Sequence, residues 1–141
     1  MLKKLFLITL LTLLLTACGG SAQSATEITL NATDFMYSPV SVTVPVGELV
    51  TLTFQNTGAV EHDFVIEKID ASVDMVEDSG SDTHHMHGAD ANYDLHFSAQ
   101  PGETSTVKFT VSESGTYQFF CSVTGHKEAG MIGELIVVAE E

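Results

Sequence analysis

The chain has 141 residues, which is enough for one domain of ordinary size and too few for two. Five basic residues stand against nineteen acidic ones, so the formal net charge at pH 7 is −14. Such a charge excludes binding to nucleic acid or to anionic lipid by electrostatic attraction, and it suits a soluble domain or one that meets a basic partner.

The N-terminus predicts export. Lys3 and Lys4 precede the apolar run LFLITLLTLLL, whose eleven residues are too few to span a bilayer comfortably but fit a secretory signal. The segment Leu15-Thr16-Ala17-Cys18 then resembles a bacterial lipobox, in which the cysteine becomes lipid-modified and begins the mature protein. We therefore predict a lipoprotein signal peptide over 1–17 and a lipid on Cys18, with cleavage that leaves a free cysteine as the alternative.

The expected mature protein has a short tether and one domain. Residues 18–25 (CGGSAQSA) are small and polar, which suits a flexible link to a domain over 26–141. Without the two lysines of the signal, three basic residues face nineteen acidic ones, which gives a net charge of −16. Attachment to the membrane must then come from the lipid, at the periplasmic or extracellular face.

Cysteine is scarce, and this scarcity is informative. The two cysteines are Cys18 and Cys121, so a lipid on Cys18 leaves Cys121 without a disulfide partner. An exported protein meets an oxidising compartment, where a lone thiol is unusual. Ligation of a metal is the simplest explanation for it.

From residue 26 onward the chain predicts β-structure. Apolar and polar residues alternate over 28–32, 40–44, 50–55, 107–111 and 117–121, a period typical of half-buried antiparallel strands. Turn sequences at 45–47, 56–58, 101–103 and 114–115 separate these runs. We predict an all-β fold, a Greek-key β-sandwich of seven or eight strands. Phe64, Phe109 and Phe119 are expected in its core.

Residues 70–94 interrupt this pattern. The segment is acidic, contains glycine and is poor in β-branched residues, so we predict a long insertion, with a short irregular helix over 71–76 as one possibility. It includes His84, His85, Met86 and His87, a density of donors that could bind a second copper ion. The alternative is a solvated acidic loop with adventitious metal affinity.

A cysteine, a histidine and a methionine recur at a fixed spacing near the C-terminus. Four residues separate Cys121 from His126, and four more separate His126 from Met131. A thiolate binds both oxidation states of copper, imidazoles do the same, and a thioether is a weak axial donor. His62, just after the turn at 56–60, supplies a second imidazole. We predict that these four residues hold copper, with His96 as the rival to His62.

The order His, Cys, His and Met on a β-sandwich resembles the plastocyanin/azurin (cupredoxin) family of blue, type 1 copper proteins. The C-x4-H-x4-M loop, with its Gly-His and Gly-Met pairs, looks most like the auracyanin-type members, which are lipoprotein or membrane-associated carriers. The resemblance covers roughly residues 28–138 and includes the motifs FMYSP (35–39), PGE (101–103) and GTY (115–117). It implies one copper ion that cycles between Cu(I) and Cu(II).

Two features depart from that resemblance. Asp63 follows His62, where the family often has an asparagine that braces the ligand loop, so the hydrogen bonding around the ligands is expected to differ. The acidic, histidine-containing segment over 70–94 is also not carried over from the family.

We expect a monomeric one-electron carrier outside the cytoplasmic membrane, and not an enzyme. Its redox partner would be a basic cytochrome or a membrane oxidoreductase complex, and nucleic acid would play no part. A copper chaperone or store that uses the His/Met-rich segment is the alternative. A multicopper oxidase or nitrite reductase is disfavoured, because the chain has one domain and no paired-histidine motifs for further coppers.

Overall fold

The computed structural model describes residues 25–77, 79 and 93–139. The predicted signal peptide, Cys18, nearly all of the predicted tether and the cluster of residues 83–88 lie outside these ranges. Within them, no helix is long and apolar enough to cross a membrane.

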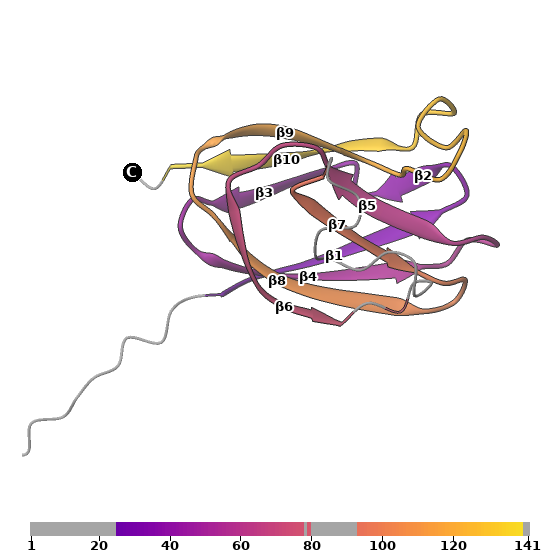
Figure 1. Ribbon diagram of the computed structural model, residues 1–141, viewed down its shortest axis with the longest axis horizontal. Helices are drawn as coiled ribbons and strands as arrows, with labels where there is room; N and C mark the ends of the chain where they lie inside the picture. The colour runs from indigo at the N-terminus through magenta and orange to yellow at the C-terminus, as the bar shows by residue number, and fades with distance from the viewer. Residues whose placement is uncertain (1–24, 78, 80–92, 140–141) are drawn as a thin grey trace, which may run out of the picture.

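In the part of the chain that the structure describes, ten strands form two five-stranded sheets that face each other (Figure 1). The first sheet has the order β2 (Met36–Ser38), β1 (Ala25–Thr33), β4 (Leu49–Asn56), β8 (Thr104–Val111) and β6 (Ala71–Glu77). The second has the order β3 (Ser41–Pro45), β10 (Ile132–Val138), β9 (Gly115–Phe120), β5 (His62–Ile66) and β7 (Leu95–Ala99). The predicted all-β sandwich is confirmed, but the described residues form ten strands and not the seven or eight expected.

Two of the strand pairs differ from the expected antiparallel pattern. β1 runs parallel to β4, and β3 runs parallel to β10, whereas the other paired strands are antiparallel. Alternation of apolar and polar side chains shows which face of a strand is buried. This alternation is the same in parallel and antiparallel pairs. The sequence pattern therefore could not distinguish the two directions.

The core lies between the sheets and is rich in aromatic rings. The Phe64 ring stacks on Phe97 with centroids 5.0 Å apart and on Phe119 at 4.6 Å. Phe109 is also fully buried, so the expectation that Phe64, Phe109 and Phe119 are core residues is confirmed. Fully burying one such side chain stabilises a fold by about 1.5–3 kcal/mol. Cys121 and Met131 belong to the same buried cluster, so the core reaches the candidate ligands.

β6 is the clearest difference from the sequence-based expectation. Residues 71–77 form a strand paired with β8, and not the short helix considered for 71–76. The register shifts between Val73 and Met75, which marks a β-bulge. The extra residue, Asp74, breaks the two-residue alternation, and this is why the segment did not resemble a strand.

The sandwich brings distant segments together at one end. The connection from β9 to β10 lies there beside the start of β5, although about sixty residues separate them along the chain (Figure 1). Within β10, Gly133 leaves room for the ring of Phe119, its partner on β9, because a Cβ at that position would collide with the ring. The fold thus positions two loops over the same buried point.

Candidate metal centre

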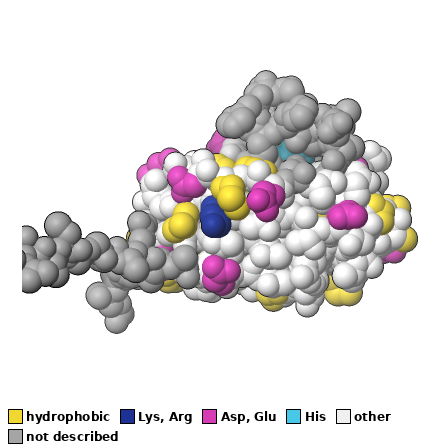
Figure 2. Space-filling model, turned by 90° about the horizontal axis from the view of Figure 1, so that it is seen from below, with side chains coloured by type: hydrophobic (Ala, Val, Ile, Leu, Met, Phe, Trp, Pro, Cys, Tyr) yellow, Lys and Arg dark blue, Asp and Glu magenta, His cyan; other side chains and the backbone are white. Residues whose placement is uncertain are grey.

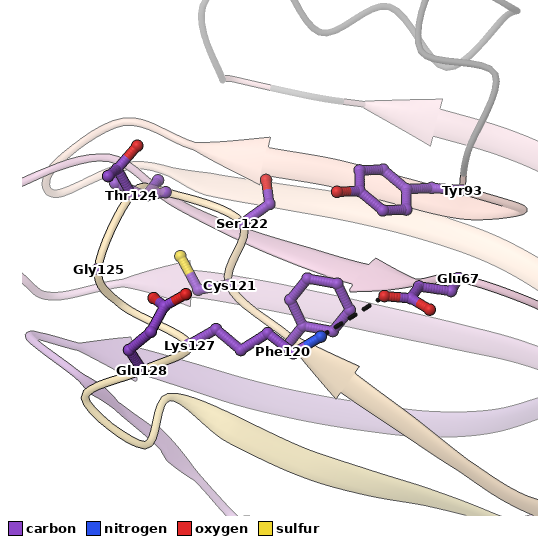
Figure 3. A pocket seen from close by; sticks show the side chains of 10 residues that line it. Glu67, Tyr93, Phe120, Cys121, Ser122, Thr124, Gly125, Lys127 and Glu128 are labelled. Carbon is purple, nitrogen blue, oxygen red and sulfur yellow. Dashed lines mark hydrogen bonds and ion pairs between the residues drawn. The ribbon is translucent and has the colours of Figure 1, made fainter.

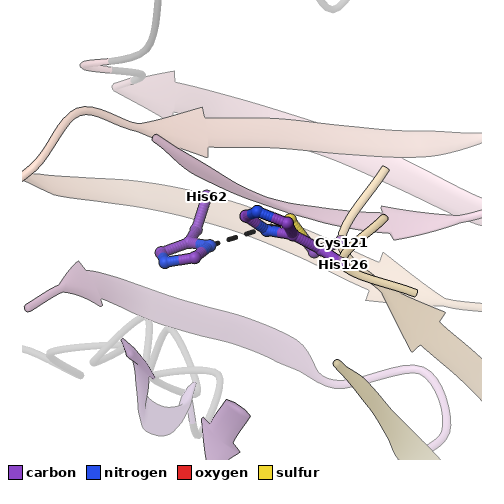
Figure 4. A group of neighbouring side chains, drawn as sticks. All are labelled: His62, Cys121 and His126. Carbon is purple, nitrogen blue, oxygen red and sulfur yellow. Dashed lines mark hydrogen bonds between the residues drawn. The ribbon is translucent and has the colours of Figure 1, made fainter. Parts of the chain in front are cut away.

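His62, Cys121 and His126 converge at this end of the sandwich. One ligand atom from each lies within 4.8 Å of the others. The Cys121 Sγ atom is 3.8 Å from Nδ1 of His62 and 3.3 Å from Nδ1 of His126. Both rings are directed at the sulfur (Figure 4). His62 and Cys121 are fully buried and His126 is 6% exposed, so the three donors form an almost enclosed set.

The loop from Cys121 to Met131 is fixed by its own backbone hydrogen bonds. The Met131 amide donates to the His126 carbonyl at 3.0 Å, and the Cys121 amide donates to the Met131 carbonyl at 3.2 Å. Gly125 and Gly130 have φ values of +86° and +99°, a region that other residues adopt only under strain. Met131 is fully buried. The backbones of all three loop residues are thereby held next to one another.

His96, the rival to His62, lies outside the cluster. It belongs to β7, where it pairs with Val65 of β5. Its Nε2 atom lies 3.3 Å from Oδ2 of Asp63. The structure therefore brings His62 to the sulfur and directs His96 to the carboxylate of Asp63.

Asp63 ties β5 to the ligand loop. Its Oδ1 accepts a hydrogen bond from the Ser122 amide at 2.6 Å, and its Oδ2 accepts one from the Ser122 hydroxyl. The Tyr37 hydroxyl donates to the carbonyl of Asp63 at 2.5 Å. Asp63 is 3% exposed. Burial raises the pKa of its carboxyl, but the hydrogen bonds from His96 and Ser122 outweigh burial and hold that pKa below its usual range.

The electrostatics favour the neutral forms of Cys121 and His62 in the absence of metal. Burial, followed by the charge of Asp63, raises the pKa of the Cys121 thiol to about 12. Burial also lowers the pKa of His62, although the carboxylate of Asp34 partly opposes this effect. Neutral imidazoles have a free electron pair for a metal, and a metal ion would displace the thiol proton. The site therefore suits a cation that binds thiolate strongly.

Two residues at the site were not predicted to belong to it. Asp34 and Phe35 form the turn between β1 and β2, and Asp34 Oδ1 lies 3.4 Å from Nε2 of His62. The amide of Ala59 donates to the same oxygen at 2.9 Å and lowers the pKa of the Asp34 carboxyl. The Phe35 ring meets His126 edge-on at 5.1 Å. Neither contact follows from spacing, because each joins segments far apart along the chain.

A shallow pocket flanks the ligand loop beside Cys121 (Figure 3). Lys127 crosses it, with Nζ 3.6 Å above the centre of the Phe120 ring and 3.5 Å from Oε1 of Glu67. The Tyr93 ring contacts Phe120 edge-on at 6.0 Å. These contacts cover the flank of the loop next to Cys121 and hold Lys127 away from the cluster.

Comparison with known proteins gives the family. The model of the cupredoxin-like domain matches residues 5–137. The chain belongs to this family. It is 33% identical to plastocyanin A'/A'' of Nicotiana tabacum over 115 residues, which cover 79% of this chain and 98% of that protein. It is 28% identical to the copper-resistant cuproprotein CopI of Rubrivivax gelatinosus over 120 residues, or 84% of this chain and 70% of that protein.

Solved structures agree with the sequence relatives. Auracyanin A of Chloroflexus aurantiacus, described as a blue copper protein, matches with a TM-score of 0.60 and 25% identity. The match covers 82% of this cupredoxin and all of that chain. The predicted resemblance to plastocyanins and auracyanins is confirmed.

The donor set fits the cofactor of this family. One thiol and two imidazoles are buried together, and these are the strong ligands of a type 1 copper site. Zinc is commonly bound by four strong donors in structural sites, whereas this cluster provides three. The predicted cofactor, one type 1 copper ion, is confirmed by the family and by this fit.

Replacing Asp63 by asparagine should reduce stability in a pH-dependent way. The folded-state pKa of Asp63 is lowered, so its contribution is present above the unfolded pKa of about 3.9 and is lost as pH falls below it. Charged hydrogen bonds contribute about 1.5–3 kcal/mol each, so we expect a deficit of about 2 kcal/mol at pH 7. Urea unfolding of the metal-free protein between pH 7 and pH 3 measures it.

The matched control is Glu134→Gln, which removes one exposed charge from β10. It should change the free energy of unfolding little at any pH. If the Asp63→Asn deficit were the same at pH 3 and pH 7, the charge of Asp63 would not be what stabilises the loop.

Proposed function

We propose that this cupredoxin is a one-electron carrier whose copper is held by His62, Cys121, His126 and Met131. The observation that carries the proposal is the buried cluster of one thiol and two imidazoles at the end of the sandwich. Copper bound there would move between Cu(II) and Cu(I) by gaining and losing one electron. The protein would turn over no substrate.

The ligand assignment rests on how the fold fixes each donor. His62 begins β5, Cys121 follows β9 directly, and the loop returns His126 over the sulfur. Met131 has its backbone bonded to both loop ligands and its side chain in the core, which suits a weak axial thioether. Donors held this firmly cannot rearrange much when the charge on copper changes, so electron exchange can be fast.

The electron would enter and leave through the edge of His126, which is the ligand nearest the surface. We expect small and apolar residues to surround this edge, namely Val60, Val123, Ala129 and Ile132. The structure adds Phe35, which is 51% exposed and packs edge-on against the His126 ring. An apolar rim would exclude water from the interface with a docked partner and would shorten the electron-transfer path between that partner and the copper.

The partner we propose is a basic cytochrome or a membrane oxidoreductase complex. This protein would bind it as a monomer. Acidic side chains spread over the face shown in Figure 2, with little basic surface between them. The sequence carries nineteen acidic residues, and the expected mature chain has three lysines. Opposite charge would speed the encounter, while the apolar rim would complete the contact.

We further propose that the protein works outside the cytoplasmic membrane and is held there by lipid on Cys18. The basic start, the apolar run of eleven residues and the sequence before Cys18 support this. A net charge of −16 on the mature chain would not itself attract an anionic membrane, so the lipid would provide the attachment.

The second candidate function is that of a copper chaperone or store. The similarity to a copper-resistant cuproprotein favours it, as does the His/Met-rich segment, which lies outside the described residues. A chaperone must release copper through exposed, exchangeable ligands, whereas the cluster at Cys121 is buried. We therefore place the carrier function first. An oxidase or nitrite reductase has less support, because the described residues contain one such cluster within one domain.

The copper-loaded protein should be intensely blue and should bleach on reduction. The colour comes from charge transfer between the thiolate and Cu(II), so Cys121→Ser should abolish it while the circular dichroism of the β-sandwich stays unchanged. Visible absorption with and without ascorbate measures this, and Thr124→Ala, at an exposed position of the same loop, serves as a control that should remain blue. A colourless wild-type Cu(II) complex would refute the assignment.

Replacing Cys18 by serine should abolish membrane attachment. Without the thiol no lipid can be added, so the protein should appear in the soluble fraction or as the uncleaved precursor. Detergent-phase partitioning of expressing cells measures it, and Ser21→Ala in the tether is the control. Partitioning of the Cys18→Ser protein like the wild type would remove the lipid from the proposal.

A further inference from the structure

We propose that Asp34 is a positioning residue for the copper site, and that its carboxylate acts through His62 to favour Cu(II). The inference rests on the proposed role of His62 as a ligand. It assigns to the turn between β1 and β2 a part in setting the reduction potential.

The geometry fixes which nitrogen of His62 carries the proton. Nε2 lies 3.4 Å from Oδ1 of Asp34, and Nδ1 lies 3.8 Å from the sulfur of Cys121 on the other side of the ring. A carboxylate oxygen can only accept, so Nε2 donates its hydrogen to Asp34. The lone pair of Nδ1 is then free and directed toward the metal position. The carboxylate thus selects the tautomer that can bind copper.

The carboxylate is held in place independently of His62. The amide of Ala59 donates to the same Oδ1 atom at 2.9 Å, which links the turn at Asp34 to the loop that leads into β5. The amide of Gly58 in turn donates to the side chain of Asn56 at 2.9 Å. Asn56 also donates to the carbonyls of Val60 and Ala99, both at 2.8 Å. The acceptor for His62 is therefore built into a hydrogen-bonded loop.

Gly58 gives a second, independent indication that the fold accommodates the contact between His62 and Asp34. A Cβ at that position would lie 2.5 Å from Nε2 of His62 and 2.7 Å from Oδ1 of Asp34. Any larger residue would therefore wedge the two apart. Glycine at 58 leaves room for the imidazole and the carboxylate to meet.

The charge of Asp34 would act differently on the two oxidation states. A negative charge hydrogen-bonded to a ligand imidazole strengthens its donation and attracts Cu(II) more than Cu(I). Asp63, the other carboxylate near the ligands, is directed at Ser122 and His96 and not at the His62 ring. Asp34 is 47% exposed, so solvent screens part of its effect. A moderate lowering of the reduction potential is what this arrangement should give.

The test compares Asp34→Asn with Glu128→Gln in the copper-loaded protein. Each removes one negative charge close to the ligands, and Asp34→Asn keeps an oxygen that accepts from Ala59. Glu128 is exposed on the loop beside Cys121 (Figure 3), and among the described residues no hydrogen bond joins it to a ligand. Spectroelectrochemical titration of the blue band measures the reduction potential of each variant.

Asp34→Asn should lower the ratio of Cu(II) affinity to Cu(I) affinity about tenfold. This is the small end of the changes in metal affinity seen when a residue hydrogen-bonded to a metal ligand is replaced. Tenfold corresponds to a rise of about 59 mV for one electron. Glu128→Gln should shift the potential by less than a quarter of that. Equal shifts in the two variants, or no shift in Asp34→Asn, would overturn the proposal.

A double mutant separates the hydrogen bond from simple charge. Gly58→Ala leaves all charges in place but intrudes on the contact, so it should raise the potential, and Asp34→Asn should add little in that background. Full additivity would contradict a role exerted through His62. If the wild-type protein bound copper without blue colour, the proposed function would fail. If every variant were blue at the wild-type potential, only the role of Asp34 would fail.

Discussion

The carboxylate of Asp63 joins the two chain segments that carry the candidate ligands. It lies one residue after His62 and accepts both the amide and the hydroxyl hydrogen of Ser122, one residue after Cys121. These segments are 59 residues apart in sequence, so no local structure could hold them in register. The Asp63 side of the clamp is almost fully buried, where such a bond is stronger than in water. The separation of the donors depends on it.

The same clamp shapes the chemistry of the sulfur. Burial and the charge of Asp63 both disfavour the thiolate, and the pKa of Cys121 rises to about 12. The protein can therefore fold around a neutral thiol, with no buried, uncompensated thiolate charge. A copper ion would supply the positive charge that the thiolate needs. Folding and metal binding are thus compatible steps, and the fold can prepare the site before the metal arrives.

Much of this arrangement could be predicted from the sequence, because the informative residues lie close together along it. Cys121, His126 and Met131 share one connection between strands, so their spacing alone indicates convergence. His62 could be chosen over His96 because a turn precedes it. Asp34 could not be found in this way, since its contact with His62 exists only after β1 packs beside β4. The β-bulge at Asp74 hid β6 for a different, local reason, because it breaks the alternation of residues along the strand.

X-ray absorption at the copper edge, recorded on the oxidised and the reduced protein, would identify the atoms bound to copper. We expect one short bond from copper to the sulfur of Cys121 and two bonds to imidazole nitrogen in both states. These distances should change little on reduction, because the ligands are fixed by β5, β9 and the loop between β9 and β10. A spectrum without a short sulfur bond, or a coordination number that changes between the two states, would contradict the proposed copper site.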